Sequence, residues 1–195
     1  MLRNPLQLRL EKFEPWQQVT FMAALVERMY PNYALFCEQT EFADPRQFHA
    51  ILDTVWESLT VKNAKANFER QLEKLEDLIP EKEVYDLYLT YPAVDACEAM
   101  ANLLHSLLDR DLIAETVLKI SQISVRSVAQ LEEAQGGEQV TDENQKSFES
   151  VCGEWDIQWD IFRALKNAES RDIEMIKGIR AELRESGISN LGIGL

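Results

Sequence analysis

Glycine and proline divide this chain between them. All seven glycines lie at position 136 or later, and all six prolines lie at position 92 or earlier. Because glycine is costly in a helix interior, its absence from residues 1–135 permits long, uninterrupted helices there. Proline is tolerated in the first turn of a helix. We therefore predict that helices open at Asn4-Pro5 and Asp44-Pro45, and at the prolines of the two Tyr-Pro pairs, 30–31 and 91–92.

The same glycine distribution excludes whole classes of function. A P-loop, a dinucleotide-binding fingerprint and a nucleophile elbow all need glycines in a tight turn that follows a strand. None of these patterns occurs in the sequence. We therefore expect neither nucleotide-dependent nor serine-hydrolase chemistry, and the sequence predicts no cofactor.

Apolar residues recur along the chain with the period of a helix. Residues 48–59 and 64–79 each place apolar side chains three or four positions apart, which builds one apolar helix face. Further helices are predicted at 15–29, 31–40, 92–109, 111–134, 142–151 and 154–186. We predict an all-α, single-domain multi-helix bundle over residues 1–195, with a loop at 135–141 and a C-terminal tail at 188–195.

The charge balance is strongly acidic and limits the partners. The chain has 34 Asp and Glu against 20 Lys and Arg, for a formal net charge of -14. Such a surface repels the phosphates of nucleic acids and anionic lipid. No apolar run approaches the roughly 18 residues of a membrane span, and charges interrupt the N-terminal leucines, unlike a signal peptide. We therefore expect a cytoplasmic protein that binds neither nucleic acid nor membrane.

The cysteines do not resemble a disulfide framework or a zinc ribbon. Cys37, Cys97 and Cys152 are odd in number and far apart, and no Cys-x-x-Cys pair occurs. We predict that they are small buried hydrophobic residues in a reducing compartment.

Two predicted helices carry a narrow polar stripe on an otherwise apolar surface. One stripe contains Asp95, Glu98 and His105, and the other contains Asp156 and Asp160. Carboxylates and imidazoles on facing helices can hold metal ions in bundles. A straight helix cannot supply one ion with both Glu98 and His105, which lie about 10 Å apart along the axis. A metal-dependent enzyme therefore requires the two stripes to face each other. The favoured interpretation is that both are solvated.

The segment "GEWDIQWDIF" (153–162) shows why solvation is favoured. Trp155 and Trp159 share the four-residue spacing of the aspartates, since both pairs follow the helix period. We predict that the tryptophans pack in the core and that Arg163 neutralises Asp160 at the surface.

The other histidine, His49, precedes Asp53 by one helical turn, with Trp56 nearby. We predict a surface His–Asp pair. A catalytic dyad would need a nucleophile, which the sequence does not identify.

Several long segments resemble the YjaG-like family of uncharacterised bacterial proteins. They are "WQQVTFMAALVERMYPNYALFCEQT" (16–40), "WESLTVKNAKANF" (56–68), "YPAVDAC" (91–97), "EWDIQWDIFR" (154–163) and "RDIEMIKGIRAELRESGISN" (171–190). The resemblance covers nearly the whole chain. It implies a cytoplasmic, single-domain helical protein and supplies no catalytic residues.

These observations favour a non-enzymatic interaction or scaffold protein that presents helical faces to a partner protein or to another copy of itself. The apolar side chains of the tail give one positive reason, because exposed apolar tails often dock on another surface. They are Ile188, Leu191, Ile193 and Leu195. The alternative is a metal-dependent enzyme that uses the carboxylate and histidine cluster between two helices.

Overall fold

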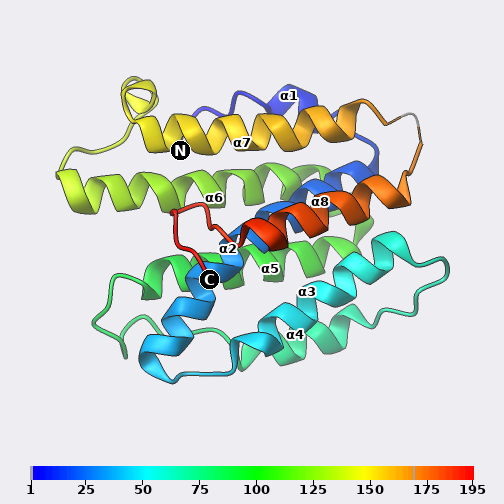
Figure 1. Cartoon of the computed structure of the whole chain (residues 1–195), viewed down its shortest axis with the longest axis horizontal. Helices are drawn as coiled ribbons and strands as arrows, with labels where there is room; N and C mark the ends of the chain where they lie inside the picture. The colour runs from blue at the N-terminus through cyan, green and yellow to red at the C-terminus, as the bar shows by residue number, and fades with distance from the viewer. Residues whose placement is uncertain (1, 169) are drawn as a thin grey trace.

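Helices form the framework of the protein (Figure 1). The structure is a computed structural model that describes residues 2–168 and 170–195. Within these residues the chain forms eight α-helices and two 3₁₀ helices, and no strand beyond an isolated bridge. The α-helices are α1 (Gln7–Leu10), α2 (Pro15–Thr40), α3 (Pro45–Thr60), α4 (Phe68–Glu76), α5 (Thr90–Leu108), α6 (Ile113–Gly136), α7 (Glu149–Lys166) and α8 (Ile173–Ser186). The 3₁₀ helices are η1 (Arg110–Leu112) and η2 (Gln145–Ser147). The predicted all-α fold class is confirmed.

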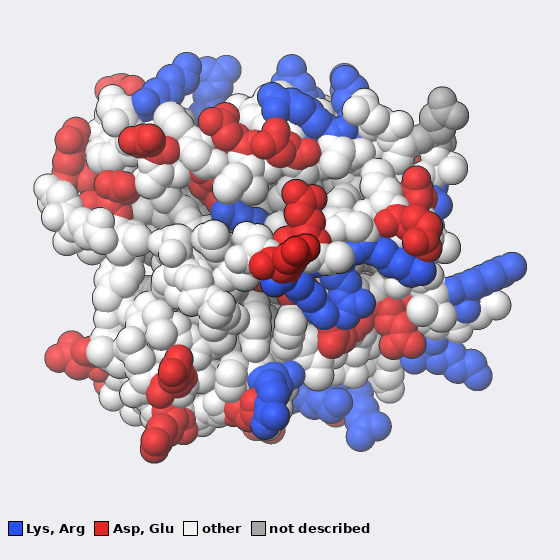
Figure 2. Space-filling model, viewed as in Figure 1, with Lys and Arg blue, Asp and Glu red and all other residues white. Residues whose placement is uncertain are grey.

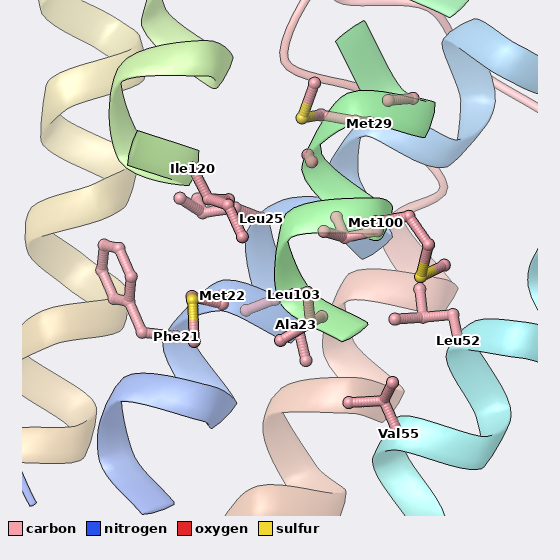
Figure 3. Packing of buried hydrophobic residues seen from close by; sticks show 14 of the residues in the cluster. Phe21, Met22, Ala23, Leu25, Met29, Leu52, Val55, Met100, Leu103 and Ile120 are labelled. Atoms are coloured by element: carbon pink, nitrogen blue, oxygen red, sulfur yellow. The ribbon is translucent and has the colours of Figure 1, made fainter. Parts of the chain in front are cut away.

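Helix α2 is the centre of the bundle. It packs against α3, α5, α6, α7 and α8, and every residue from Gln17 to Met29 is buried. A helix surrounded on all sides must be apolar around most of its circumference. Figure 3 shows Met22 and Leu25 of α2 beside Ile120 of α6 and Leu103 of α5. Burial against several helices, rather than local propensity, stabilises this segment.

Pro31 lies inside α2, where the sequence predicted the start of a new helix. Proline removes one backbone donor from a helix interior and crowds the preceding turn, which normally costs about 3 kcal/mol. Here residues on both sides of Pro31 are fully buried, including Met29 and Tyr33. The packing of α2 against its neighbours offsets this cost, so that one helix replaces the predicted pair 15–29 and 31–40.

The predicted helix 154–186 is divided into α7 and α8. The side chain of Asp172 accepts a hydrogen bond from the backbone N–H of Met175 at 3.0 Å, which caps the first turn of α8. Just before it, the guanidinium of Arg171 donates to the carbonyl oxygens of Ser58 (2.9 Å) and Leu59 at the end of α3. These contacts redirect the chain, so α8 packs against α2 and α3 instead of continuing α7.

Three helices, α5, α6 and α7, lie side by side, with α6 in the middle (Figure 1). Helix α8 packs against α2, and the segment after it turns back on itself (Figure 1). Gly187 makes this turn with a positive φ of 58°, which glycine adopts without strain. An antiparallel bridge between Ile188 and Gly194 then closes the tail on itself.

No helix in the two described segments is long and apolar enough to cross a membrane.

Candidate functional site

The Asp95 stripe of α5 faces α6. The buried Asp95 carboxylate accepts hydrogen bonds from Arg126 (2.5 Å) and from the Ser127 hydroxyl (2.6 Å). Glu98 pairs with Arg126 at 2.9 Å and lies 3.9 Å from the Lys119 ammonium. The side chains of Asp95 and Glu98 are therefore engaged with α6. His105 lies further along α5 and is exposed.

The aspartates of α7 lie elsewhere. Asp156 and Asp160 are exposed, and Asp160 pairs with Arg163 at 2.7 Å, as predicted. Because α6 lies between α5 and α7, the structure does not bring the two polar stripes together. Across residues 2–168 and 170–195, no group of three or more His, Cys, Asp or Glu side chains is placed to hold a metal ion.

The tryptophans of this helix differ in burial. Trp155 is 7% exposed and its indole N–H donates to Gln145 at 3.1 Å. Trp159 is half-buried: it packs edge-on against Phe162, and the guanidinium groups of Arg9 and Arg163 lie over its ring. Trp155 is thus a core residue, whereas Trp159 packs at the edge of the core.

A buried carboxylate that sequence reasoning did not single out, Glu27 of α2, joins three helices. It accepts hydrogen bonds from Trp56 Nε1 (2.8 Å) and from Arg184 Nε (3.0 Å) and Nη2 (3.1 Å). His49 Nε2 lies 2.5 Å from its Oε1 atom. The only sequence signal was a Glu-Arg pair, 27–28, inside the apolar stretch 21–29.

His49 therefore pairs with Glu27 rather than forming the predicted surface pair with Asp53. Its ring also stacks on Tyr30, with centroids 4.2 Å apart. Asp53 instead accepts hydrogen bonds from Arg180 (2.6 Å) and Arg184 (2.5 Å) of α8. His49 and Asp53 do lie one turn apart on α3, but each forms its hydrogen bonds with a neighbouring helix: His49 with α2 and Asp53 with α8.

The Glu27 cluster keeps its carboxylates ionised. Burial raises the pKa of Glu27, but the hydrogen bonds and charges of His49 and Arg184 outweigh it, so the net pKa lies below the usual value. The pKa of Asp53 is lowered in the same way, chiefly by Arg184 against the effect of burial. Figure 2 shows acidic and basic side chains interleaved over α8 and α3, where this cluster lies. The arrangement is a network of ion pairs that ties α8 to the bundle.

A second buried carboxylate, Glu154 of α7, accepts from Arg28 (2.5 Å), Ser124 (2.7 Å) and Gln158 (2.9 Å). The tail meets this network through Asn190, whose side chain donates to the carbonyl oxygen of Ser124 at 2.9 Å. Sequence reasoning missed this network too, although Glu154 and Gln158 share a face of α7 with the core residue Trp155 nearby.

The C-terminal tail is anchored to its own chain by polar contacts. Asn190 is 9% exposed, its backbone N–H donates to the Arg28 carbonyl at 3.3 Å, and its Oδ1 accepts from Asn32 at 2.8 Å. The apolar side chains expected to dock on a partner are divided. Leu191 and Ile193 are half-buried, whereas Ile188 and Leu195 are more than half exposed.

The cysteines are all free thiols. Cys37 and Cys97 are buried, as predicted, and burial raises the pKa of both thiols, so they remain protonated. Cys152 is half-buried, with its sulfur 3.5 Å from the Lys146 carbonyl oxygen.

A groove with a volume of about 630 Å³ lies along α6. Helix α6 supplies most of its lining, Glu98 of α5 forms part of one wall, and the N-terminal segment 2–7 forms another. That segment is held in place because Gln122 donates to the Leu2 carbonyl at 2.7 Å and Asn4 donates to Ser121 at 2.9 Å. The α6 side chains in the lining are Glu115, Leu118, Lys119, Gln122, Ile123, Arg126, Ala129, Gln130 and Glu133. They are spaced as one helical stripe.

Comparison with known proteins places this fold and sequence in a family. The family model described as "Protein of unknown function (DUF416)" matches residues 5–194. This chain belongs to the DUF416 family. The protein YjaG of Salmonella typhimurium is 56% identical over 99% of this chain and 98% of its own length. YjaG of Escherichia coli is 55% identical over the same shares.

Two further chains extend the comparison. A protein of Haemophilus influenzae is 46% identical over 98% of each chain. The crystal structure of a DUF416 family protein from Shewanella baltica matches with a TM-score of 0.91 and 32% identity, over 99% of this chain and all of that one. The resemblance to the YjaG-like family is therefore confirmed. The names of these relatives state no activity.

Proposed function

We propose that this DUF416 protein is a non-enzymatic, cytoplasmic interaction protein and that the groove along α6 is its binding surface. The observation that carries the proposal is the position of α6. Its other faces pack against α2, α5 and α7, whereas four polar side chains of the stripe are exposed to solvent: Glu115, Lys119, Arg126 and Gln130. An amphipathic groove beside an uncovered helix face is a common way to receive a partner.

The engagement of the charged side chains supports the same interpretation. The carboxylates of Asp95, Glu27 and Glu154 each accept at least two hydrogen bonds from donors of the same chain. A group that has to accept a proton from a substrate or bind a metal needs a free lone pair directed at the ligand. These three carboxylates are instead used to join helices.

Site-specific photo-crosslinking in living cells tests this proposal. A photoreactive amino acid is introduced at Lys119 or Gln130, which are exposed in the groove, and at Asp156 on the exposed face of α7 as a control. We expect the same crosslinked species from both groove positions and none from Asp156. A crosslink at the mass of two chains would identify a second copy as the partner. The absence of any crosslink from the groove would contradict the proposal.

A further inference from the structure

We infer that the α6 groove receives a basic amphipathic helix of a partner protein. This inference rests on the proposed function, because it names the partner of the same groove. It is carried by the distribution of charged and apolar side chains along the stripe of α6.

Acidic side chains lie at both ends of the stripe. Glu115 is exposed near the start of α6, and Glu133 is half-buried near its end. No salt bridge of either side chain occurs within the described residues, and Glu133 accepts only the backbone N–H of Val140, at 2.9 Å. The negative charge of both carboxylates can therefore pair with a cation of a ligand.

The cations of the groove, by contrast, are already neutralised. Arg126 is shared between Asp95 and Glu98, and Lys119 donates to Asn102 at 2.8 Å and lies beside Glu98. The groove therefore presents net negative charge at its ends, in a chain whose formal charge is -14. A positively charged ligand is complementary to it.

Apolar side chains lie between the acidic ends. Leu118 of α6 and Leu2 of the N-terminal segment are half-buried in the groove, whereas Ile123, Ala129 and Val140 line it from below and are themselves buried. This middle section suits the apolar face of a helix, whose anchors repeat every three or four residues.

The distance between the two acidic ends of the stripe sets the length of the ligand helix. At 1.5 Å per residue, Glu115 and Glu133 lie about 27 Å apart along α6. A ligand helix of about 18 residues, or five turns, would bring a basic residue at each end close to one of them. A second copy of this chain is a poorer occupant because it carries the same large negative charge.

Two labelled peptides of about 18 residues test the inference. They share one apolar stripe, and one carries lysines in its first and last turns where the other carries glutamates. Fluorescence anisotropy measures their binding to full-length protein, to Glu115→Gln/Glu133→Gln and to the control Glu69→Gln/Glu73→Gln on exposed positions of α4. The substitution Glu133→Gln keeps an oxygen that can accept the Val140 N–H, so the variant removes charge and leaves this turn intact.

We expect the lysine peptide to bind and the glutamate peptide to bind much more weakly. The groove variant should raise the dissociation constant of the lysine peptide about five- to tenfold. The α4 control should raise it less than about twofold. Raising the salt from about 50 to about 200 mM should also weaken it, since the contacts are exposed to solvent.

Failure of the lysine peptide to bind, or equal binding to the groove variant, overturns the inference. The two proposals fail separately. If the groove positions still crosslink a partner in cells, the groove is an interaction surface for a different chemistry. If they crosslink nothing, the proposed function fails as well.

Discussion

Glu27 of α2 and Arg184 of α8 form a two-point ion pair across 157 positions of the chain, with N···O distances of 3.0 and 3.1 Å. The carboxylate is 3% exposed and also accepts the indole N–H of Trp56. One buried group thereby joins α2, α3 and α8. Because α8 contributes only one buried apolar residue, Ile176, this pair is a principal attachment of the helix.

Replacing Arg184 with methionine should destabilise the protein strongly. Methionine keeps the packing of the stem but removes the guanidinium that binds the buried Glu27 carboxylate at two points, so that only His49 and Trp56 remain beside it. Removing one partner of a buried ion pair typically costs about 3 kcal/mol. Urea unfolding followed by tryptophan fluorescence measures this loss. The matched control on α8 is Lys177→Met, which breaks only the exposed pair with Glu174 and should cost less than about 0.5 kcal/mol. An equal loss in the free energy of unfolding for the two variants would show that the buried pair stabilises the protein no more than the exposed pair does.

Acid should weaken the attachment of α8. The pKa values of Glu27 and Asp53 are lowered in the folded protein, where Arg184 binds both. Their stabilising contribution is therefore complete above the unfolded-state values, near pH 4, and is lost as the pH falls through the folded-state values. We expect the free energy of unfolding to be nearly flat from about pH 7 to 5 and to fall below about pH 4.

The variant Glu27→Gln isolates this contribution. It should be less stable at neutral pH and should show a shallower loss of stability in acid, because one of the two carboxylates no longer titrates. The control Asp156→Asn, on the exposed face of α7, should change the stability at neutral pH by less than about 0.5 kcal/mol. Parallel profiles for wild-type protein and Glu27→Gln would contradict the assignment.

The double variant Asp156→Asn/Asp160→Asn should behave like the wild type. Both side chains are exposed, and the Asp160–Arg163 pair contributes about 0.3–0.5 kcal/mol at most. We expect the thermal midpoint of both proteins to be unaffected by Mg²⁺, Mn²⁺ or Zn²⁺. A metal-dependent midpoint that disappears in the double variant would restore the metal-dependent alternative.

Asn190→Ala should loosen the C-terminal tail. The substitution removes the side-chain hydrogen bonds to Ser124 and Asn32 and leaves the buried side-chain N–H of Asn32 without its acceptor, at a cost of about 1–3 kcal/mol. Leu195→Ala, at an exposed position of the same tail, should change stability by less than about 0.5 kcal/mol. Hydrogen exchange should show faster exchange of the backbone N–H groups of Asn190 and Ile193 in the first variant alone.

Local signals predicted the helical framework well. The apolar period of residues 48–59 became the buried face of α3, and the Asp44-Pro45 cap opens that helix as expected. Pro31 was misleading because local rules assign proline to a helix start, while the decisive contribution comes from burial against α3 and α5. The break between α7 and α8 was missed because Arg171 reaches the end of α3, more than a hundred positions away.

The candidate site was less accessible from the sequence. The groove is formed by α6, α5 and the N-terminal segment, and its lining residues show no distinctive pattern until these elements lie together. Nothing in the sequence around Glu27 and Glu154 distinguishes these buried carboxylates from exposed polar residues of a helix. Asp156 and Asp160 were predicted as candidates because of their four-residue spacing, and both are exposed.

The sequence by itself determined the helical fold class, the exposed strip of α7 and the acidic character of the chain, because periodicity and composition are local properties. The tertiary structure alone decided which donors complete each buried carboxylate, where the tail is anchored and which face of α6 stays open. The physical reason is that a buried charge needs hydrogen-bond donors, and these come from helices far away in the sequence. The spacing of residues along the chain does not show which helices will be neighbours.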